Sequence, residues 1–334
     1  MVFSFSSEQP ALLCHSDERL ALMQLKDSFI IDKQALANGS CAYPKAWISA
    51  VVAFYGSINS TSTLFRLVHL HKLNLAKNHF NYSVIPYALG NLSMLTSLNL
   101  SSSEFSGQIP SEISNLHRLS SLDLSYVDLA SHIPSVLANL SSLTSLNLDS
   151  CGLQGMFPLA IFQLPKLETI WLVRNSDLKD FLVLPASIGN IDSLEYLGLG
   201  NCNFTGSVPS TWVPPTLGNL TKLYKLYLQS NHFTGVIPSE LTNLTQLTFL
   251  DLQGNMLQGS VPSSISRLEK LNFFDCDYNR LGGLLEMDAF LELKDLQYLF
   301  LSLNDFNLVS RNDSNATGPQ AQLLDIGLRT CHIV

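Results

Sequence analysis

Leucines recur at one spacing through most of this chain. The hexamer LTSLNL occurs at residues 95–100 and again at residues 143–148, and residues 119–124 fill the same frame halfway between them. The frame is L-x-x-L-x-L-x-x-N, and most copies follow the previous one after 24 or 25 residues. Its first leucines are Leu70, Leu95, Leu119, Leu143, Leu167, Leu194, Leu223, Leu247, Leu271, Leu296 and Leu323. A unit this short cannot bury its own leucines, so the units must stack on one another to form a continuous core.

Each copy of the frame predicts a strand followed by an irregular return. The L-x-L core alternates apolar and polar residues, which is the period of a half-buried strand. A second pattern then follows, as in residues 233–238 (FTGVIP), where glycine permits a tight backbone and proline restricts pairing to an edge. We therefore expect an α/β-type solenoid that has a parallel β-sheet on its concave face and an irregular or 3-10 convex side.

The last position of the frame most often carries an amide. It holds Asn78, Asn175, Asn231, Asn255, Asn279 and Asn304. A buried amide at this position can satisfy turn backbone groups that would otherwise lack a hydrogen bond. Cys151, Cys202 and Cys331 replace it with a weaker donor, and Val127 offers no donor. We therefore expect a looser turn at Val127.

The full pattern L-x-x-L-x-L-x-x-N-x-L-x-G-x-I-P resembles the plant-type leucine-rich repeat over residues 64–331. Residues 14–29 resemble the capping helix of plant receptor-like proteins. Together with residues 55–62 and 73–80, they are most similar to the Verticillium-wilt-resistance type. The resemblance implies a plasma-membrane pathogen sensor that faces the cell exterior. It also implies that the sensor has no kinase domain and signals through a partner receptor kinase.

The resemblance divides the chain into three parts. Residues 1–13 are similar to a degenerate signal peptide, with no basic region and only a fragment of an apolar core. Residues 14–63 resemble an incomplete N-terminal cap with a helix at about residues 17–30. In an oxidising compartment, a disulfide between Cys14 and Cys41 could hold this helix in place. Residues 64–334 hold about ten repeats and part of an eleventh. We therefore expect a shortened copy of a receptor, which would be secreted if it is exported.

Charge and glycosylation motifs indicate the class and compartment. The formal net charge of −8 argues against a nucleic-acid partner, and no apolar run of about 20 residues predicts a membrane span. Asn-x-Ser/Thr occurs at Asn38, Asn59, Asn81, Asn91, Asn99, Asn139, Asn203, Asn219, Asn243, Asn312 and Asn315. This density is typical of a secreted ectodomain, because glycosylation requires export. Several of the motifs nevertheless arise from the Asn-Leu-Ser/Thr of the repeat itself.

Catalytic chemistry has little support in the sequence. No set of nucleophile, base and acid stands out, and every glycine motif follows the repeat, so we expect no enzyme, cofactor or metal site. Asp251 and Asp275 hold equivalent positions on neighbouring predicted strands, which lie about 4.8 Å apart. That distance approaches the separation in a retaining glycosidase. Aspartate is ordinary at this position, as at Asp123, and an open sheet face encloses no substrate, so we reject catalysis there.

The residues between the strand leucines predict the binding face. In the early repeats they are small and polar, as in residues 96–101. From the fifth repeat onward the candidates are Trp171, Arg174, Tyr196, Tyr224, Lys225, Tyr227, Phe249, Phe273, Tyr278, Tyr298 and Phe300. Contiguous exposed aromatics are typical of an interaction site. The alternative is that cross-strand aromatic pairs only stabilise the sheet.

Three functions are compatible with these patterns. The first is the ectodomain of a receptor-like protein that binds a peptide, protein or glycan in plant defence. The second is an enzyme inhibitor similar to the polygalacturonase-inhibiting proteins, which should carry disulfide caps at both ends. The third is a shortened receptor copy without function.

Overall fold

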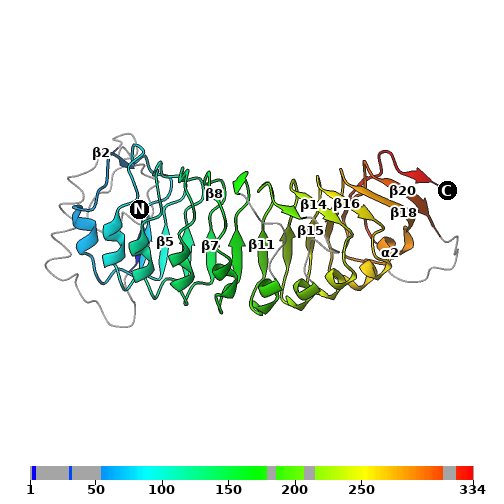
Figure 1. The fold of residues 1–334 in the computed structure, drawn as a ribbon, viewed down its shortest axis with the longest axis horizontal. Coiled ribbons are helices and arrows are strands. Elements are labelled where there is room, and N and C mark those ends of the chain that lie inside the picture. Colours follow the sequence, from blue (N-terminus) through cyan, green and yellow to red (C-terminus); the bar gives the residue numbers. More distant parts are fainter. Residues whose placement is uncertain are drawn as a thin grey trace, which may run out of the picture. The chain divides into compact units, whose positions relative to one another are not determined.

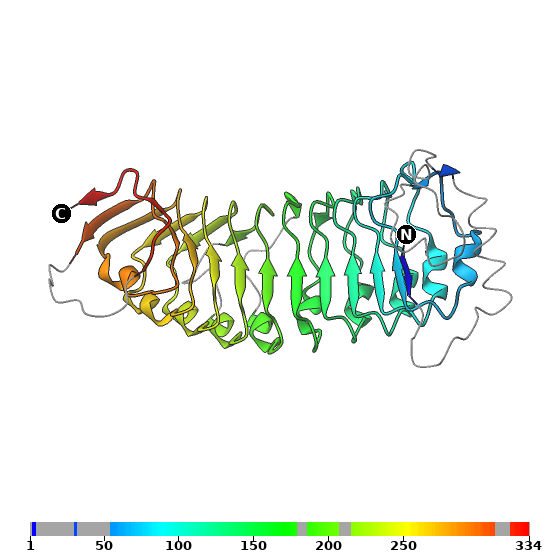
Figure 2. The same cartoon turned by 180° about the vertical axis from the view of Figure 1, so that it is seen from behind.

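A computed structural model describes residues 2–4, 30–31, 54–178, 186–206, 215–310 and 321–333. The chain divides into two compact units, Met1–Gln154 (unit 1) and Gly155–Val334 (unit 2). In each unit the strands of the repeats lie side by side and point in the same direction (Figures 1 and 2).

The main sheet of unit 1 is built from one short strand per repeat. These are β4 (Lys72–Asn74), β5 (Ser97–Asn99), β6 (Ser121–Asp123) and β7 (Ser145–Asn147), and they pair in parallel. Strand β1 (Val2–Ser4) pairs antiparallel with β4. Strand β2 (Ile30–Ile31) pairs antiparallel with β3 (Phe54–Tyr55), so Ile30, at the end of the helix predicted for about residues 17–30, lies in a strand. The remainder of that helix, Cys14 and Cys41 lie outside the described residues.

Unit 2 continues the same frame. Its repeat strands are β9 (Thr169–Trp171), β11 (Tyr196–Gly198), β13 (Lys225–Tyr227), β15 (Phe249–Asp251), β17 (Phe273–Asp275), β19 (Tyr298–Phe300) and β21 (Asp325–Gly327). Each pairs in parallel with the next. The parallel strands with one register per repeat confirm the predicted repeat solenoid fold.

A second parallel sheet forms beyond the turns of unit 2, where the sequence predicted only irregular chain. It contains β12 (Thr205–Gly206), β14 (His232–Gly235), β16 (Met256–Gly259), β18 (Arg280–Glu286), β20 (Asp305–Val309) and β22 (His332–Ile333). A two-residue strand, β8 (Gln154–Gly155), pairs with β10 (Asp177–Leu178). Pairing satisfies backbone groups of the return segments that would otherwise need water.

Short 3-10 helices line the side of each repeat that leads back to the next strand. In unit 1 they are η2 (Thr63–Arg66), η3 (Tyr87–Asn91), η4 (Ser111–Asn115) and η5 (Ser135–Asn139). In unit 2 they are η6 (Leu159–Gln163), η7 (Ala186–Asn190), η8 (Pro215–Asn219), η9 (Ser239–Asn243) and η10 (Ser263–Arg267), followed by one α-helical turn, α2 (Asp288–Leu291). Proline occupies the N-cap of most of them, as at Pro110 and Pro238, where its fixed φ directs the chain into the turn.

The frame leucines form the core, and the frame asparagines satisfy the turns. Leu250 and Leu252 are fully buried. The amide of Asn255 donates to the carbonyls of Leu228 and Leu252 at 3.0 Å each, and its oxygen accepts from Phe233 N at 3.1 Å. These bonds confirm the predicted role of the amide.

The turn at Val127 does not loosen, contrary to the prediction. Val127 N donates to Leu124 O at 3.1 Å, and Tyr126 N donates to Asp149 O at 2.8 Å. The Cys151 thiol of the following repeat donates to Leu124 O at 3.0 Å. A donor from the neighbouring repeat thus replaces the amide that position 127 lacks.

Candidate functional site

The repeat frame places the predicted aromatic residues in two rows on the strand face of unit 2. The first row has the register Tyr196, Lys225, Phe249, Phe273 and Tyr298. The second row, two residues later on each strand, has the register Trp171, Gly198, Tyr227, Asp251, Asp275 and Phe300. The aromatic ladder is defined here as Trp171, Tyr196, Tyr227, Phe249, Phe273, Tyr298 and Phe300, all of them half-buried.

Ring stacking orders the centre of the aromatic ladder. The Phe249 ring centroid lies 4.2 Å from that of Phe273, with an interplanar angle of 6°, and 4.4 Å from that of Tyr227. Phe273 also contacts Tyr298 and Phe300, at centroid distances of 6.0 and 5.8 Å. Since Phe249 has neighbours stacked on both sides, its ring offers mainly an edge to solvent. The ladder is therefore an apolar ridge of ring edges.

Gly198, the last residue of β11, lets the ladder continue toward β9. A Cβ built on Gly198 would come within 2.3 Å of Trp171 Cε3, so the indole of Trp171 lies over the position of that missing side chain. There the indole reaches Tyr227, at a centroid distance of 4.9 Å. Gly200 is covered in the same way by the side chain of Gln229. Glycine in a strand commonly marks such a close approach, and this Gly-x-Gly signal was not used in predicting the site.

A cation lies within the first row, on β13 between Tyr196 and Phe249. The Lys225 ammonium lies 6.0 Å from the ring centroid of Tyr196 and 5.5 Å from that of Tyr224. The two tyrosine rings meet edge to face at 5.5 Å. Lys225 therefore replaces an aromatic ring in the first row through cation–π contact.

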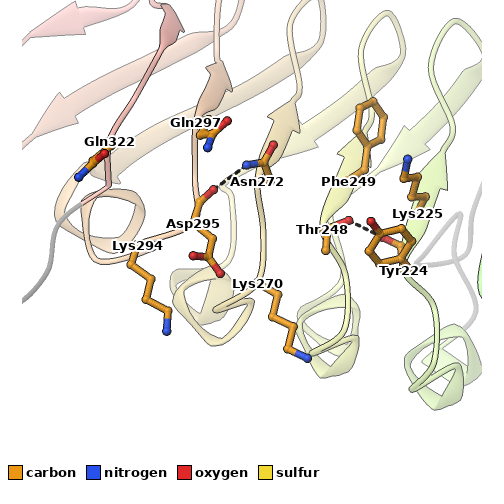
Figure 3. A pocket seen from close by; sticks show the side chains of 10 residues that line it. All are labelled: Tyr224, Lys225, Thr248, Phe249, Lys270, Asn272, Lys294, Asp295, Gln297 and Gln322. Atoms are coloured by element: carbon orange, nitrogen blue, oxygen red, sulfur yellow. Dashed lines mark hydrogen bonds between the residues drawn. The ribbon is translucent and has the colours of Figure 1, made fainter.

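A cavity of about 430 Å³ opens along the edge of the sheet where the strands of unit 2 begin (Figure 3). Lys225, Lys270 and Lys294 contribute three cations to its lining, and Asp295 contributes a carboxylate. Phe249 lines it too, so the cavity adjoins the aromatic ladder. We call this cavity the lysine pocket. Lys270 and Lys294 were missed by the sequence analysis, because they precede the strand leucines instead of standing between them.

Carboxylates lie in the second row beside the ladder. Burial, with a smaller contribution from neighbouring carboxylates, raises the pKa of Asp251 to about 6 and that of Asp275 to about 7. Each carboxylate also accepts a backbone N–H two residues ahead, from Gln253 at 3.1 Å and from Asp277 at 2.8 Å, which lowers the pKa. Burial and Asp251 also raise the pKa of Tyr227.

Three of the predicted binding residues lie outside the ladder. Arg174 and Tyr278 follow the strands in turns with positive φ, at 60° and 55°, and both are exposed. Tyr224 precedes β13 and lines the lysine pocket instead. The alternation of the strand does not extend into the turn, so these two side chains lie beyond the strand face, and their part in ligand binding stays a prediction.

Most glycosylation candidates are accessible. Asn59, Asn81, Asn91, Asn139, Asn203, Asn219 and Asn243 are exposed. Asn99 is half-buried on the strand face of unit 1, and its side-chain oxygen accepts Ser101 N at 2.9 Å. Asn38, Asn312 and Asn315 lie outside the described residues.

The described residues contain no group of three or more His, Cys, Asp or Glu side chains that could hold a metal ion. None of the helices in that part of the chain has the length and apolar character needed to cross a bilayer.

Family models match separate parts of the chain. A model described as leucine rich repeat matches residues 221–281, and another with the same description matches residues 94–116, 142–164 and 193–220.

Curated relatives from Arabidopsis thaliana are similar over longer stretches. Receptor-like protein 41 is 36% identical over 189 residues, which are 56% of this chain and 21% of the relative. Receptor-like protein 7 is 39% identical over an alignment of 112 positions that covers 29% of this chain and 12% of that protein. The chain thus spans between 12% and 21% of the length of these two relatives.

Solved structures share the fold. The ectodomain of the Arabidopsis receptor kinase HAESA, in complex with an extended IDA peptide hormone, matches with a TM-score of 0.75 and 28% identity over 87% of this chain and 50% of that chain. The plant peptide hormone receptor RGFR1, in complex with RGF2, matches with a TM-score of 0.66 and 28% identity over 76% of this chain and 39% of that chain. A plant ice-binding protein matches with a TM-score of 0.60 over 88% of both chains, but at 24% identity it shows only the fold.

Proposed function

We propose that this chain, a plant-type leucine-rich-repeat protein similar to receptor-like proteins, recognises a peptide or protein ligand with the aromatic ladder of unit 2. It acts by binding and not by catalysis. By analogy with its relatives, it functions at the extracellular face of the plasma membrane in plant defence and signals together with a receptor kinase.

The observation that carries this proposal is the continuous ladder on an open sheet face. Its side chains are half-buried by one another and keep their edges in contact with solvent. An uncovered apolar patch of this kind is typical of an interaction site, and Tyr, Trp and Arg are favoured energetic anchors there. The HAESA and RGFR1 ectodomains that share this fold were solved with peptide hormones.

Ring orientation favours a peptide or protein over a glycan. A sugar stacks on the open face of an aromatic ring, whereas Phe249 has Tyr227 stacked on one side and Phe273 on the other. Ring edges pack well against aliphatic and aromatic side chains. The ladder therefore suits apolar side chains presented by an extended polypeptide.

The test compares two triple variants in a screen of short random peptides against the full chain. Tyr196→Ala/Phe249→Ala/Tyr298→Ala removes rings from the ladder, and Tyr82→Ala/Tyr87→Ala/Tyr126→Ala removes three exposed rings from unit 1. We expect the ladder variant to weaken binding of the captured peptides by about a hundredfold or more, because central aromatic anchors contribute about 2 kcal/mol each. The control should bind normally. Unchanged binding with a markedly lower Tm of the ladder variant would show that the rings only stabilise the sheet.

A further inference from the structure

We infer that the lysine pocket is a carboxylate-binding subsite, which takes an acidic group of a peptide whose neighbouring apolar side chain lies on the aromatic ladder. The inference rests on the proposed function and adds the chemical class of the ligand. The acidic group is either an Asp or Glu side chain or the terminal carboxylate of the peptide.

The charge of the pocket is the first support. The lining contains three lysines, Lys225, Lys270 and Lys294, and a single carboxylate, that of Asp295. Within residues 215–310 none of these lysines lies within ion-pair distance of a described carboxylate. The Lys270 ammonium instead donates to a neutral partner, Gln246 Oε1, at 2.6 Å. The pocket thus keeps an excess of positive charge, although the whole chain is acidic at −8.

Hydrogen bonds to the backbone fix two walls of the pocket. Asn272 Nδ2 donates to Asp295 O at 2.9 Å, which ties the segment before β19 to the residue before β17. Thr248 Oγ1 donates to Tyr224 O at 3.2 Å and ties the residue before β15 to the segment before β13. The side-chain amides of Gln297 and Gln322 also line the pocket and offer N–H donors to a bound oxygen. An anionic oxygen would therefore find both positive charge and donors.

Phe249 joins the pocket to the ladder. Its ring lines the lysine pocket and also stacks on Tyr227 and Phe273 (Figure 3). Adjacent residues of an extended peptide lie about 3.3 Å apart along the chain, so a carboxylate in the pocket places the next side chains on the ring edges. The two features together select an acidic residue close to an apolar one.

Many surface lysines only contact solvent and take no part in binding. The repeat offers a matched control that tests this alternative. Lys222 stands directly before Leu223 as Lys270 stands before Leu271, and both lysines are exposed. Lys222 does not line the pocket. If the lysines only provide solubility or general attraction, replacing either one should have the same effect.

The experiment screens the full chain against short random peptides on beads, each sequence made with a free and with an amidated C-terminus. We expect the captured sequences to be enriched in Asp, Glu or a free C-terminus next to Phe, Leu or another apolar residue. For the best sequence, Kd is then measured with the native chain, Lys270→Met, its matched control Lys222→Met, and the double variant Lys270→Met/Lys294→Met. The same measurements use an analogue in which Asn or Gln replaces the acid, or an amide replaces the terminal carboxylate.

The double lysine variant should weaken binding of the acidic peptide about tenfold, since each exposed charge pair contributes up to about 1 kcal/mol. It should no longer distinguish the acid from its amide analogue, whereas Lys222→Met should still distinguish them. Captured peptides without acidic preference, or equal weakening of acid and amide, would overturn the inference and leave the proposed function standing. Capture of no peptide would overturn both. A preference for phosphorylated or sulfated residues over carboxylates in a follow-up panel would also contradict the inference.

Discussion

In unit 1 the leading position of three successive repeat strands holds Ser97, Ser121 and Ser145 in register, whereas three successive strands of unit 2 hold Lys225, Phe249 and Phe273 there. The backbone pairing is the same in both units. The side chains at these positions differ in the groups that they contact within the protein. This contrast separates the contribution of the frame from the contribution of its variable positions.

Polar residues on the strand face of unit 1 are largely engaged with their own backbone. The side-chain oxygens of Asn99 and Asn147 accept N–H groups two residues ahead, at 2.9 and 3.1 Å. Ser120 Oγ donates to Thr96 O at 2.9 Å, and Thr144 Oγ1 donates to Ser120 O at 3.1 Å. Such local bonds leave less capacity for a ligand. The ladder rings of unit 2 consist mainly of carbon and carry few hydrogen-bonding groups. Their edges therefore leave an apolar surface that a ligand can cover.

One large effect is expected at the last position of the repeat frame, which both units share. Asn255→Ala leaves Phe233 N without its partner and removes one of the two asparagine donors from each of the Leu228 and Leu252 carbonyls, so we expect a loss of about 3 kcal/mol in the free energy of unfolding. Ser103→Ala, at the same frame position of unit 1, removes one bond to Leu100 O and should cost about 1 kcal/mol. Urea denaturation measures both. Equal losses would show that the amide bonds do not set turn stability.

The next effect is a pH dependence specific to unit 2. The pKa values of Asp251 and Asp275, about 6 and about 7, lie above the usual value for aspartate, so the folded state binds more protons than the unfolded state from about pH 4 to pH 7. The free energy of unfolding should therefore fall as pH rises through this window, by about 3 kcal/mol or somewhat more.

Denaturation at pH 5 and pH 8 tests this dependence. Asp251→Asn/Asp275→Asn should flatten the profile and raise stability at pH 8. The same replacement at Asp123, which pairs in the sheet of unit 1, should keep the slope because both raised carboxyls remain. A native profile that rises with pH across the window would show that the two carboxyls are not the controlling groups.

A smaller effect is expected at the glycine that lets the ladder cross β11. Gly198→Ala places a methyl group within 2.3 Å of the Trp171 ring, so the indole must move away from Tyr227. We expect a cost of about 1–3 kcal/mol, as for overpacking. The fluorescence of Trp171, measured with Trp47 and Trp212 replaced by Phe, should shift toward that of a solvated indole. An unchanged spectrum would mean that the ladder does not depend on this close approach.

The smallest effect distinguishes the two interpretations of the rings. A double-mutant cycle with Phe249→Ala and Phe273→Ala should give a coupling of about 0.5–1 kcal/mol to stability, which is usual for a cross-strand aromatic pair. The equivalent cycle with Ser121→Ala and Ser145→Ala in unit 1 should give a coupling near zero. A coupling well above this range for the phenylalanines would assign the rings mainly to sheet stability.

Much of the fold could be read from the sequence because the repeat constrains it at every period. The leucine frame fixed the strands, and the shared positions of Tyr196, Phe249, Phe273 and Tyr298 predicted the register that the paired strands have. The second sheet of unit 2 could not be read in this way, because residues such as those of β18 (Arg280–Glu286) lack the alternation that marks a strand. The similarity to the Verticillium-wilt-resistance type stays a prediction.

The sequence by itself determined the repeat, the buried leucines and the rows of aromatic residues, because these follow from spacing along the chain. Only the tertiary structure decided which side chains from different repeats meet. It brought Trp171 over Gly198, buried Asp251 and Asp275 enough to raise their pKa values, and gathered Lys225, Lys270 and Lys294 around one pocket. Contact between repeats depends on side-chain direction and on the volume left by neighbours, and neither is encoded by the period of the frame.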